Sequence, residues 1–102
     1  MTKYVKIYTL DKMLTEEDLR VFPEVIDNMA ERAVWLYQND EISERNSWHL
    51  LTYIQPDSMD LDTGDLVLCP YGSKQVIGVF LGVEHDKIKE NVQYKEIIKK
   101  LK

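Results

Sequence analysis

The side chains that could carry out chemistry in this chain are few, and none occurs at a catalytic or metal-binding spacing. The two histidines, His49 and His85, are far apart in sequence and have no partners at ligand spacing. Gly72-Ser73-Lys74 lacks the glycine spacing of a phosphate-binding loop, and no serine lies in a nucleophile elbow. The sequence therefore predicts no metal, no cofactor and no enzymatic activity.

The single cysteine, Cys69, lies between Leu68 and Pro70 in an apolar run. No nearby cation would hold it as a thiolate, so we expect a buried and inert thiol. One cysteine cannot form an internal disulfide, and neither a signal peptide nor an apolar run of membrane-spanning length is visible. These features favour a cytoplasmic protein.

What remains is a binding surface made of rings and cations. Trp48, Tyr53, Tyr71 and Phe80 could stack on bases. A phosphate track could be formed by six lysines, namely Lys74, Lys87, Lys89, Lys95, Lys99 and Lys100. The alternative is that Trp48 and Phe80 belong to the core and that the lysines form an ordinary solvated face. The net charge of −5, with its acidic excess between residues 12 and 46, does not favour DNA as the first choice of partner.

The apolar pattern predicts that the chain is organised around a β-hairpin between residues 63 and 83. One strand covers 66–69, the chain reverses over 70–74, and the return strand covers 75–83. Apolar residues alternate on both faces of the return strand, with Gly78 and Gly82 on one of them. Two glycines on one face indicate sharp coiling, a bulge or the close approach of another backbone. We therefore expect a small, strongly curved sheet or barrel.

Two more strands and a helical segment complete the predicted domain, which covers residues 1–102. Residues 3–10 and 48–55 have the composition and alternation of strands. Between them, Thr15 and the acids after it indicate a short helix that ends before Pro23. Apolar residues at helical spacing then predict a second helix of about four turns, whose apolar face docks on the sheet. The pattern of residues 94–101 fits either a helix or a strand.

Several short motifs recur in an order that is typical of one family. They are Leu51-Thr52-Tyr53 with Pro56, Gly64 to Gly72, Gly78 to Val83, and Lys95 before Ile97-Ile98. In this order the second half of the chain resembles the N-terminal DNA-binding domain of primosomal protein N′ (PriA), the replication-restart helicase. The resemblance implies a small β-barrel that captures the 3′ end of a DNA strand, and it favours a strand at residues 94–101.

The resemblance also implies the residues of a 3′-end pocket, namely Leu51, Thr52, Gly64 and Lys95. Leu51 stands where the family has an aromatic ring, and Thr52 stands where it has an acid; a threonine can still hydrogen-bond a terminal hydroxyl. With Tyr53, Tyr71 and Lys74 these residues form the predicted nucleic-acid-binding set. The helicase part of the family has no counterpart here, so we expect no unwinding activity.

The helical segment at 15–46 has no counterpart in the family pattern and is predicted to be an acidic insertion. The sequence thus supports two hypotheses. The first is a non-enzymatic module that binds single-stranded or 3′-terminal DNA in replication or in phage and mobile-element biology. The second is a protein-interaction adaptor or inhibitor that contacts a protein partner through Glu24, Asp27 and Glu31. The fold class expected in both cases is mainly β with a two-helix insertion.

Overall fold

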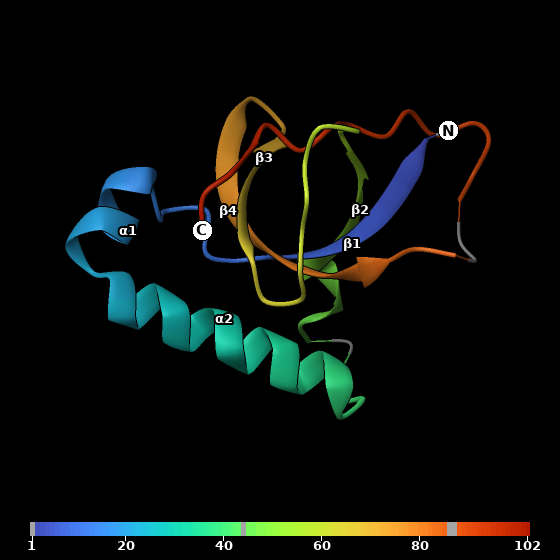
Figure 1. Cartoon of the computed structure of the whole chain (residues 1–102). Coiled ribbons are helices and arrows are strands. Elements are labelled where there is room, and N and C mark those ends of the chain that lie inside the picture. The colour runs from blue at the N-terminus through green and yellow to red at the C-terminus, as the bar shows by residue number, and fades with distance from the viewer. Residues whose placement is uncertain (1, 44, 86–87) are drawn as a thin grey trace.

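The computed structural model describes residues 2–43, 45–85 and 88–102 of the chain (Figure 1). Its strands are β1 (Lys3–Thr9), β2 (Leu50–Gln55), β3 (Leu66–Tyr71), β4 (Lys74–Val83) and β5 (Lys99–Lys100). Its helices are α1 (Glu16–Val21), α2 (Pro23–Gln38) and a short 3₁₀ turn, η1 (Ser47–His49). The strands form one antiparallel sheet in the order β2-β1-β4-β3-β5. The prediction of a mainly β domain with a two-helix insertion is confirmed.

The predicted hairpin lies at the centre of this sheet. Tyr71 at the end of β3 pairs with Lys74 at the start of β4, so only Gly72 and Ser73 make the turn. The reversal is therefore tighter than the predicted span of 70–74, and Pro70 belongs to the strand. Gly72 has a φ of 60°, the left-handed value that a two-residue hairpin turn requires.

Strand β4 is buried on both faces, as its alternating pattern predicted. One face packs inside the curved sheet against an inner cluster of Val5, Ile7, Tyr53, Val67, Cys69, Val76, Phe80 and Ile97. The opposite face packs under helix α2 in an outer cluster of Leu10, Ile26, Ala30, Ala33, Leu66, Ile77, Val79 and Leu81. Figure 1 shows α2 lying along this outer side of the sheet. The predicted docking of the helix's apolar face is confirmed.

The two glycines of β4 mark a close approach and a bulge. A Cβ atom added at Gly78 would lie 2.3 Å from Cγ2 of Ile7, so β1 and β4 could not pack this closely with any larger residue at that position. The pairing of β1 with β4 shifts register between Lys6 and Ile7, opposite Leu81 and next to Gly82. Gly82 has a φ of 155°, which other residues rarely adopt. Both expectations for these glycines are confirmed.

The sheet is strongly curved but is not a closed barrel. Strand β5 has two residues and pairs only with β3. The residues just before it make a single parallel bridge to the other edge, where Glu96 pairs with Ile54. The backbone N–H of Ile97 donates to Ile54 over 3.0 Å, and that of Ile98 donates to Leu68 over 2.8 Å. The strand that the resemblance implied at residues 94–101 is thus present only at Lys99–Lys100, and the residues before it connect β2 to β3 through single backbone contacts.

The segment predicted as a strand at 48–55 begins instead with the turn η1, and β2 starts at Leu50. Trp48 in this turn is 58% exposed, so the alternative that placed it in the core is wrong, whereas Phe80 is buried at 5%. The predicted helix start at Thr15 is present as a capping box with Asp18. Pro23 lies in the first turn of α2, where its missing N–H costs nothing.

We predict that Gly78→Ala destabilises the protein by about 1–3 kcal/mol, because the new methyl group would overlap the stiff, β-branched side chain of Ile7. Urea unfolding measures the change. In an Ile7→Leu background, where the branch point lies one carbon further out, the loss should be smaller. An equal loss in both backgrounds would show that this contact is not the cause.

Candidate nucleic-acid interface

Tyr53 of the predicted set is committed to the interior. It is 5% exposed, and its hydroxyl donates a hydrogen bond of 2.8 Å to the backbone carbonyl of Pro70. Burial raises the pKa of this phenol well above its ordinary value. Tyr53 therefore ties β2 to β3 across the inner cluster, as a protonated hydrogen-bond donor.

Leu51 and Thr52 point to opposite faces of β2, because successive side chains of a strand alternate. Leu51 is half-buried against the inner cluster. Thr52 lies on the outer face, opposite Lys6 of β1. The ammonium of Lys6 donates a hydrogen bond of 2.7 Å to the hydroxyl of Tyr37 on α2, so the helix reaches this side of the sheet.

Gly64 lies across the sheet from Leu51. Its N–H donates to the carbonyl of Phe80 over 2.9 Å; Phe80 in turn pairs with Ile7, and Ile7 pairs with Leu51. Three strand spacings, or about 14 Å along the sheet, separate the two residues. Gly64 also borders a shallow cavity that contains Asp27 and Glu31 of α2. Leu51 on β2 and Gly64 just before β3 therefore lie on different parts of the curved sheet, and the helix places acids beside the glycine.

Lys74 and Lys95 are exposed cations in the family-like half of the chain. Lys74 lies at the hairpin end opposite Tyr71, which is half-buried. Lys95 lies beside β2, because its carbonyl accepts the N–H of Ile54 over 2.9 Å. In Figure 1 this part of the chain runs along the side of the sheet away from α2. The acidic helices therefore do not cover Lys95.

The last lysines of the chain are engaged with acids. Lys99 pairs with Glu16 over 2.9 Å, Lys100 with Asp65 over 3.3 Å, and Lys102 with Asp27 over 2.8 Å. Two lysines of the predicted phosphate track, Lys99 and Lys100, therefore already have carboxylate partners, and Lys87 lies outside the described residues. Lys74 and Lys95 have no carboxylate partner among the described residues.

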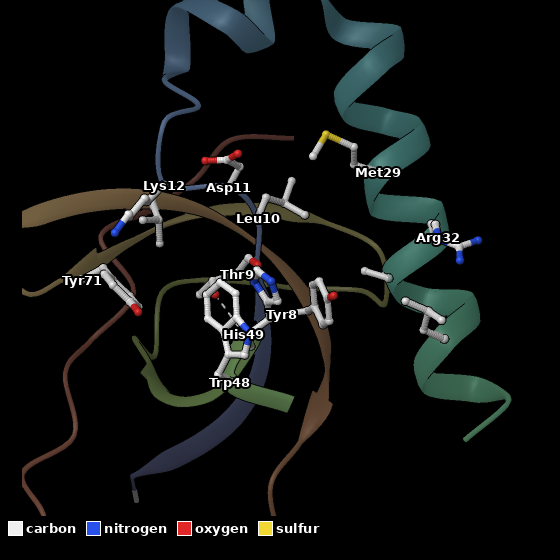
Figure 2. A pocket seen from close by; sticks show the side chains of 13 residues that line it. Tyr8, Thr9, Leu10, Asp11, Lys12, Met29, Arg32, Trp48, His49 and Tyr71 are labelled. Carbon is white, nitrogen blue, oxygen red and sulfur yellow. Dashed lines mark hydrogen bonds between the residues drawn. The ribbon is translucent and has the colours of Figure 1, made fainter. Parts of the chain in front are cut away.

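A cavity of about 500 Å³ lies between the end of β1, the turn η1, the hairpin and α2 (Figure 2). Three rings gather in it. The ring of His49 stacks on Trp48, with centroids 3.5 Å apart, and on Tyr8, with centroids 5.1 Å apart. We call Tyr8, His49 and Trp48 the ring stack. Tyr71 lines the same cavity and connects it to the hairpin.

Hydrogen bonds hold the ring stack in place. Nδ1 of His49 lies 2.7 Å from the carbonyl oxygen of Thr9; a carbonyl only accepts, so this nitrogen carries the proton. The hydroxyl of Thr9 donates back to the carbonyl of His49 over 3.1 Å. The indole N–H of Trp48 donates to the carbonyl of Arg45 over 2.9 Å. The indole is thus oriented, while much of its surface stays exposed.

Two cations, Lys12 and Arg32, border this cavity, and the one acid among its lining residues is Asp11. The carboxylate of Asp11 accepts the backbone N–H of Met13 over 2.8 Å. Neither cation has a carboxylate partner among the described residues. Burial raises the pKa of Tyr8, and the nearby Arg32 charge opposes that shift. The rim is therefore locally positive in an acidic protein.

Sequence inspection found only part of this cavity. It named Trp48 and Tyr71 as rings that could stack, but it missed Tyr8, Lys12 and Arg32. These residues come from segments that are neighbours only in the folded chain, and none belongs to a recognisable motif. Their exposure next to aromatic residues is a signal that only the tertiary structure supplies.

The comparison with known families places the chain in the class of DNA-binding domains. The model of the PriA family described as the 3′ DNA-binding domain (3′BD) matches residues 42–102, which is more than half of the chain. The chain belongs to this family, and the resemblance found in the sequence is confirmed. Strand β1 and both α-helices precede the matched segment. No curated protein and no solved structure matched the chain.

The matched domain is a DNA-binding module rather than a catalytic domain. Within the described ranges, no three His, Cys, Asp or Glu side chains come together as metal ligands. The described helices are also too short or too polar to cross a membrane.

We predict that stability falls in alkali because of two buried acids, Cys69 and Tyr53. Burial raises the pKa of the Cys69 thiol from 9.0 to about 12, and it also raises that of Tyr53. The folded chain holds both protons more tightly than the unfolded chain does. The contribution of these two groups to the free energy of unfolding should therefore be constant below about pH 8 and then fall, by up to about 1.4 kcal/mol per pH unit for each group, as pH rises from 9 towards 12.

Urea unfolding across this pH range is the measurement. Cys69→Ala should remove the contribution of the thiol and leave that of Tyr53. A Cys69→Ala variant with the same alkaline slope as the parent would refute the assignment.

Proposed function

We propose that this chain is a non-enzymatic module that binds single-stranded DNA at a 3′ end, in the cytoplasm, in replication or mobile-element biology. The observation that carries the proposal is the family match over residues 42–102. This segment contains all seven residues of the predicted nucleic-acid-binding set.

The members of that set with accessible polar groups define how the strand end would be held. Thr52 offers a hydroxyl that can donate to or accept from a terminal sugar hydroxyl. Lys95 lies beside the same strand, and Lys74 lies at the hairpin end, where each can contact a phosphate. Leu51 and Tyr71 are half-buried; Leu51 offers apolar surface on the face opposite Thr52, and Tyr71 offers it at the hairpin end beside Lys74. Tyr53 and Gly64 would not contact the strand through their side chains. They would support the site by their hydrogen bonds to the backbone of Pro70 and Phe80.

The proposal predicts binding to short oligonucleotides that depends on both salt and the chemistry of the 3′ end. Fluorescence anisotropy with a 3′-hydroxyl strand and its 3′-phosphate counterpart, across a salt series, provides the measurement. Lys95→Ala should weaken binding about three- to tenfold and should reduce the slope of log affinity against log salt by about 0.7.

Lys102→Ala is the matched control. It removes the same charge, but this lysine is already held by Asp27 in an exposed pair that contributes little to stability. An affinity that is the same for the 3′-hydroxyl and 3′-phosphate strands and that does not change with salt concentration would refute the proposal.

A second candidate function is supported by the outer surface of the helices. Val21, Phe22, Val25 and Trp35 are each more than half exposed, although they are large apolar residues. Glu24 and Glu31 are exposed on the same helix. Apolar residues rimmed by charge are typical of protein-binding surfaces. We therefore propose contact with a basic protein surface as the alternative function of the insertion.

This alternative predicts a stoichiometric protein complex that survives Lys95→Ala and fails in the double variant Glu24→Lys/Glu31→Lys. Affinity purification followed by analytical ultracentrifugation measures it. Asp27 is left unchanged because its carboxylate already pairs with Lys102, so its reversal would also free that lysine and add a second change of charge. A complex that is indifferent to the charge reversal would exclude the helix surface as the contact.

A further inference from the structure

We infer that the cavity around the ring stack binds a second nucleobase of the same DNA strand, a few nucleotides from its 3′ end, by stacking on Trp48. The inference rests on the proposed function and extends the binding surface beyond the predicted 3′-end residues. The ligand class is therefore a short single strand rather than an isolated terminal nucleotide.

The first support is the state of the Trp48 ring. One face of the indole is covered by His49 at 3.5 Å, and its N–H is bonded to Arg45, yet the residue is 58% exposed. The indole is therefore already fixed by His49 and Arg45 while much of its surface is exposed. It can stack on a base without first losing side-chain conformational freedom. Stacking on such rings tolerates any base, because every base has a π-face.

The second support is the shape and charge of the cavity. Its volume of about 500 Å³ lies within the range of roughly 300–1,000 Å³ that is typical of ligand sites. In Figure 2, Lys12 and Tyr71 lie on one side of the rings, and Arg32 lies on α2 on the other side. The side chains of both cations are exposed and unpaired within the described part of the chain. They can contact the phosphates that flank a stacked base.

The third support is continuity with the proposed 3′-end site. Trp48 and His49 directly precede β2, which carries Leu51 and Thr52. Tyr71 belongs to the predicted nucleic-acid-binding set and also lines the cavity. Thr52 lies on the strand that follows Trp48 and His49, and Lys74 pairs with Tyr71 of the cavity, so a strand held at either residue lies next to an element that lines the cavity.

Three of the residues around the cavity come from the part of the chain before the family match. Tyr8, Lys12 and Arg32 all precede residue 42, where the family match begins. The ring stack thus joins a family segment, which supplies Trp48 and His49, to a segment outside the match. We infer that β1 and α2 of this chain enlarge the strand-binding surface of the domain.

The test uses a Trp35→Phe background, in which Trp48 is the sole tryptophan because the chain has two. Oligothymidylates of two, four and six nucleotides, each with a 3′-hydroxyl, are titrated while anisotropy and Trp48 emission are both recorded. We expect the tetranucleotide to bind about tenfold more tightly than the dinucleotide and to quench Trp48. A tetranucleotide with an abasic position at the stacked nucleotide should lose both effects.

Two protein variants sharpen the test. Trp48→Ala should remove the gain between the dinucleotide and the tetranucleotide and leave dinucleotide binding unchanged. Lys12→Ala should weaken tetranucleotide binding and lower its salt dependence, whereas Lys102→Ala removes the same charge from a lysine held by Asp27 and should do neither. The abasic strand requires no change in the protein, so a folding defect of Trp48→Ala would not leave the question open.

The failures of the two proposals are distinguishable. Anisotropy that shows 3′-dependent binding of equal strength for all lengths, with unchanged Trp48 emission, would overturn the cavity assignment and leave the proposed function standing. Absence of binding by every oligonucleotide would overturn both.

Discussion

The fold depends on one strand that is buried on both of its faces. Strand β4 packs its Val76 and Phe80 face into the inner cluster and its Ile77, Val79 and Leu81 face under α2. A sheet with two apolar faces needs cover on both sides, since each exposed apolar face would cost free energy roughly in proportion to its area. The curved sheet covers one face with its own strands, and the helical insertion covers the other.

This constraint gives the insertion a structural role before any partner is considered. Ile26, Ala30 and Ala33 of α2 are buried against the sheet, so the helix belongs to the core of the domain. Two exposed ion pairs, Lys99 with Glu16 and Lys102 with Asp27, join the acidic helices to the C-terminal segment. Such pairs contribute little stability individually. They neutralise part of the acidic excess and determine which cations remain available for DNA.

The electrostatic consequence is a protein whose net charge is a poor guide to its binding surface. The chain carries −5 overall, and six of its 18 acids lie on α1 and α2, three on each helix, while Lys74, Lys95, Lys12 and Arg32 have no carboxylate partner among the described residues. Over distances longer than about 10 Å, salt screens the acids from these cations. A DNA-binding module with an acidic sequence is therefore physically consistent.

The sequence by itself determined the local elements, because the period-two and period-3.6 apolar patterns and the Thr15 cap act through near neighbours and backbone conformation. The sequence also identified the family, because the family's motifs are short and occur in a fixed order along the chain. Only the tertiary structure decided that the C-terminal lysines Lys99 and Lys102 pair with helix acids. It alone brought Tyr8, Lys12 and Arg32 to Trp48 and His49. The contacts around Trp48 and His49 join residues that are far apart in the chain. The distances between these residues depend on how α2 packs against the bulged strand β4, and no local sequence pattern encodes that packing.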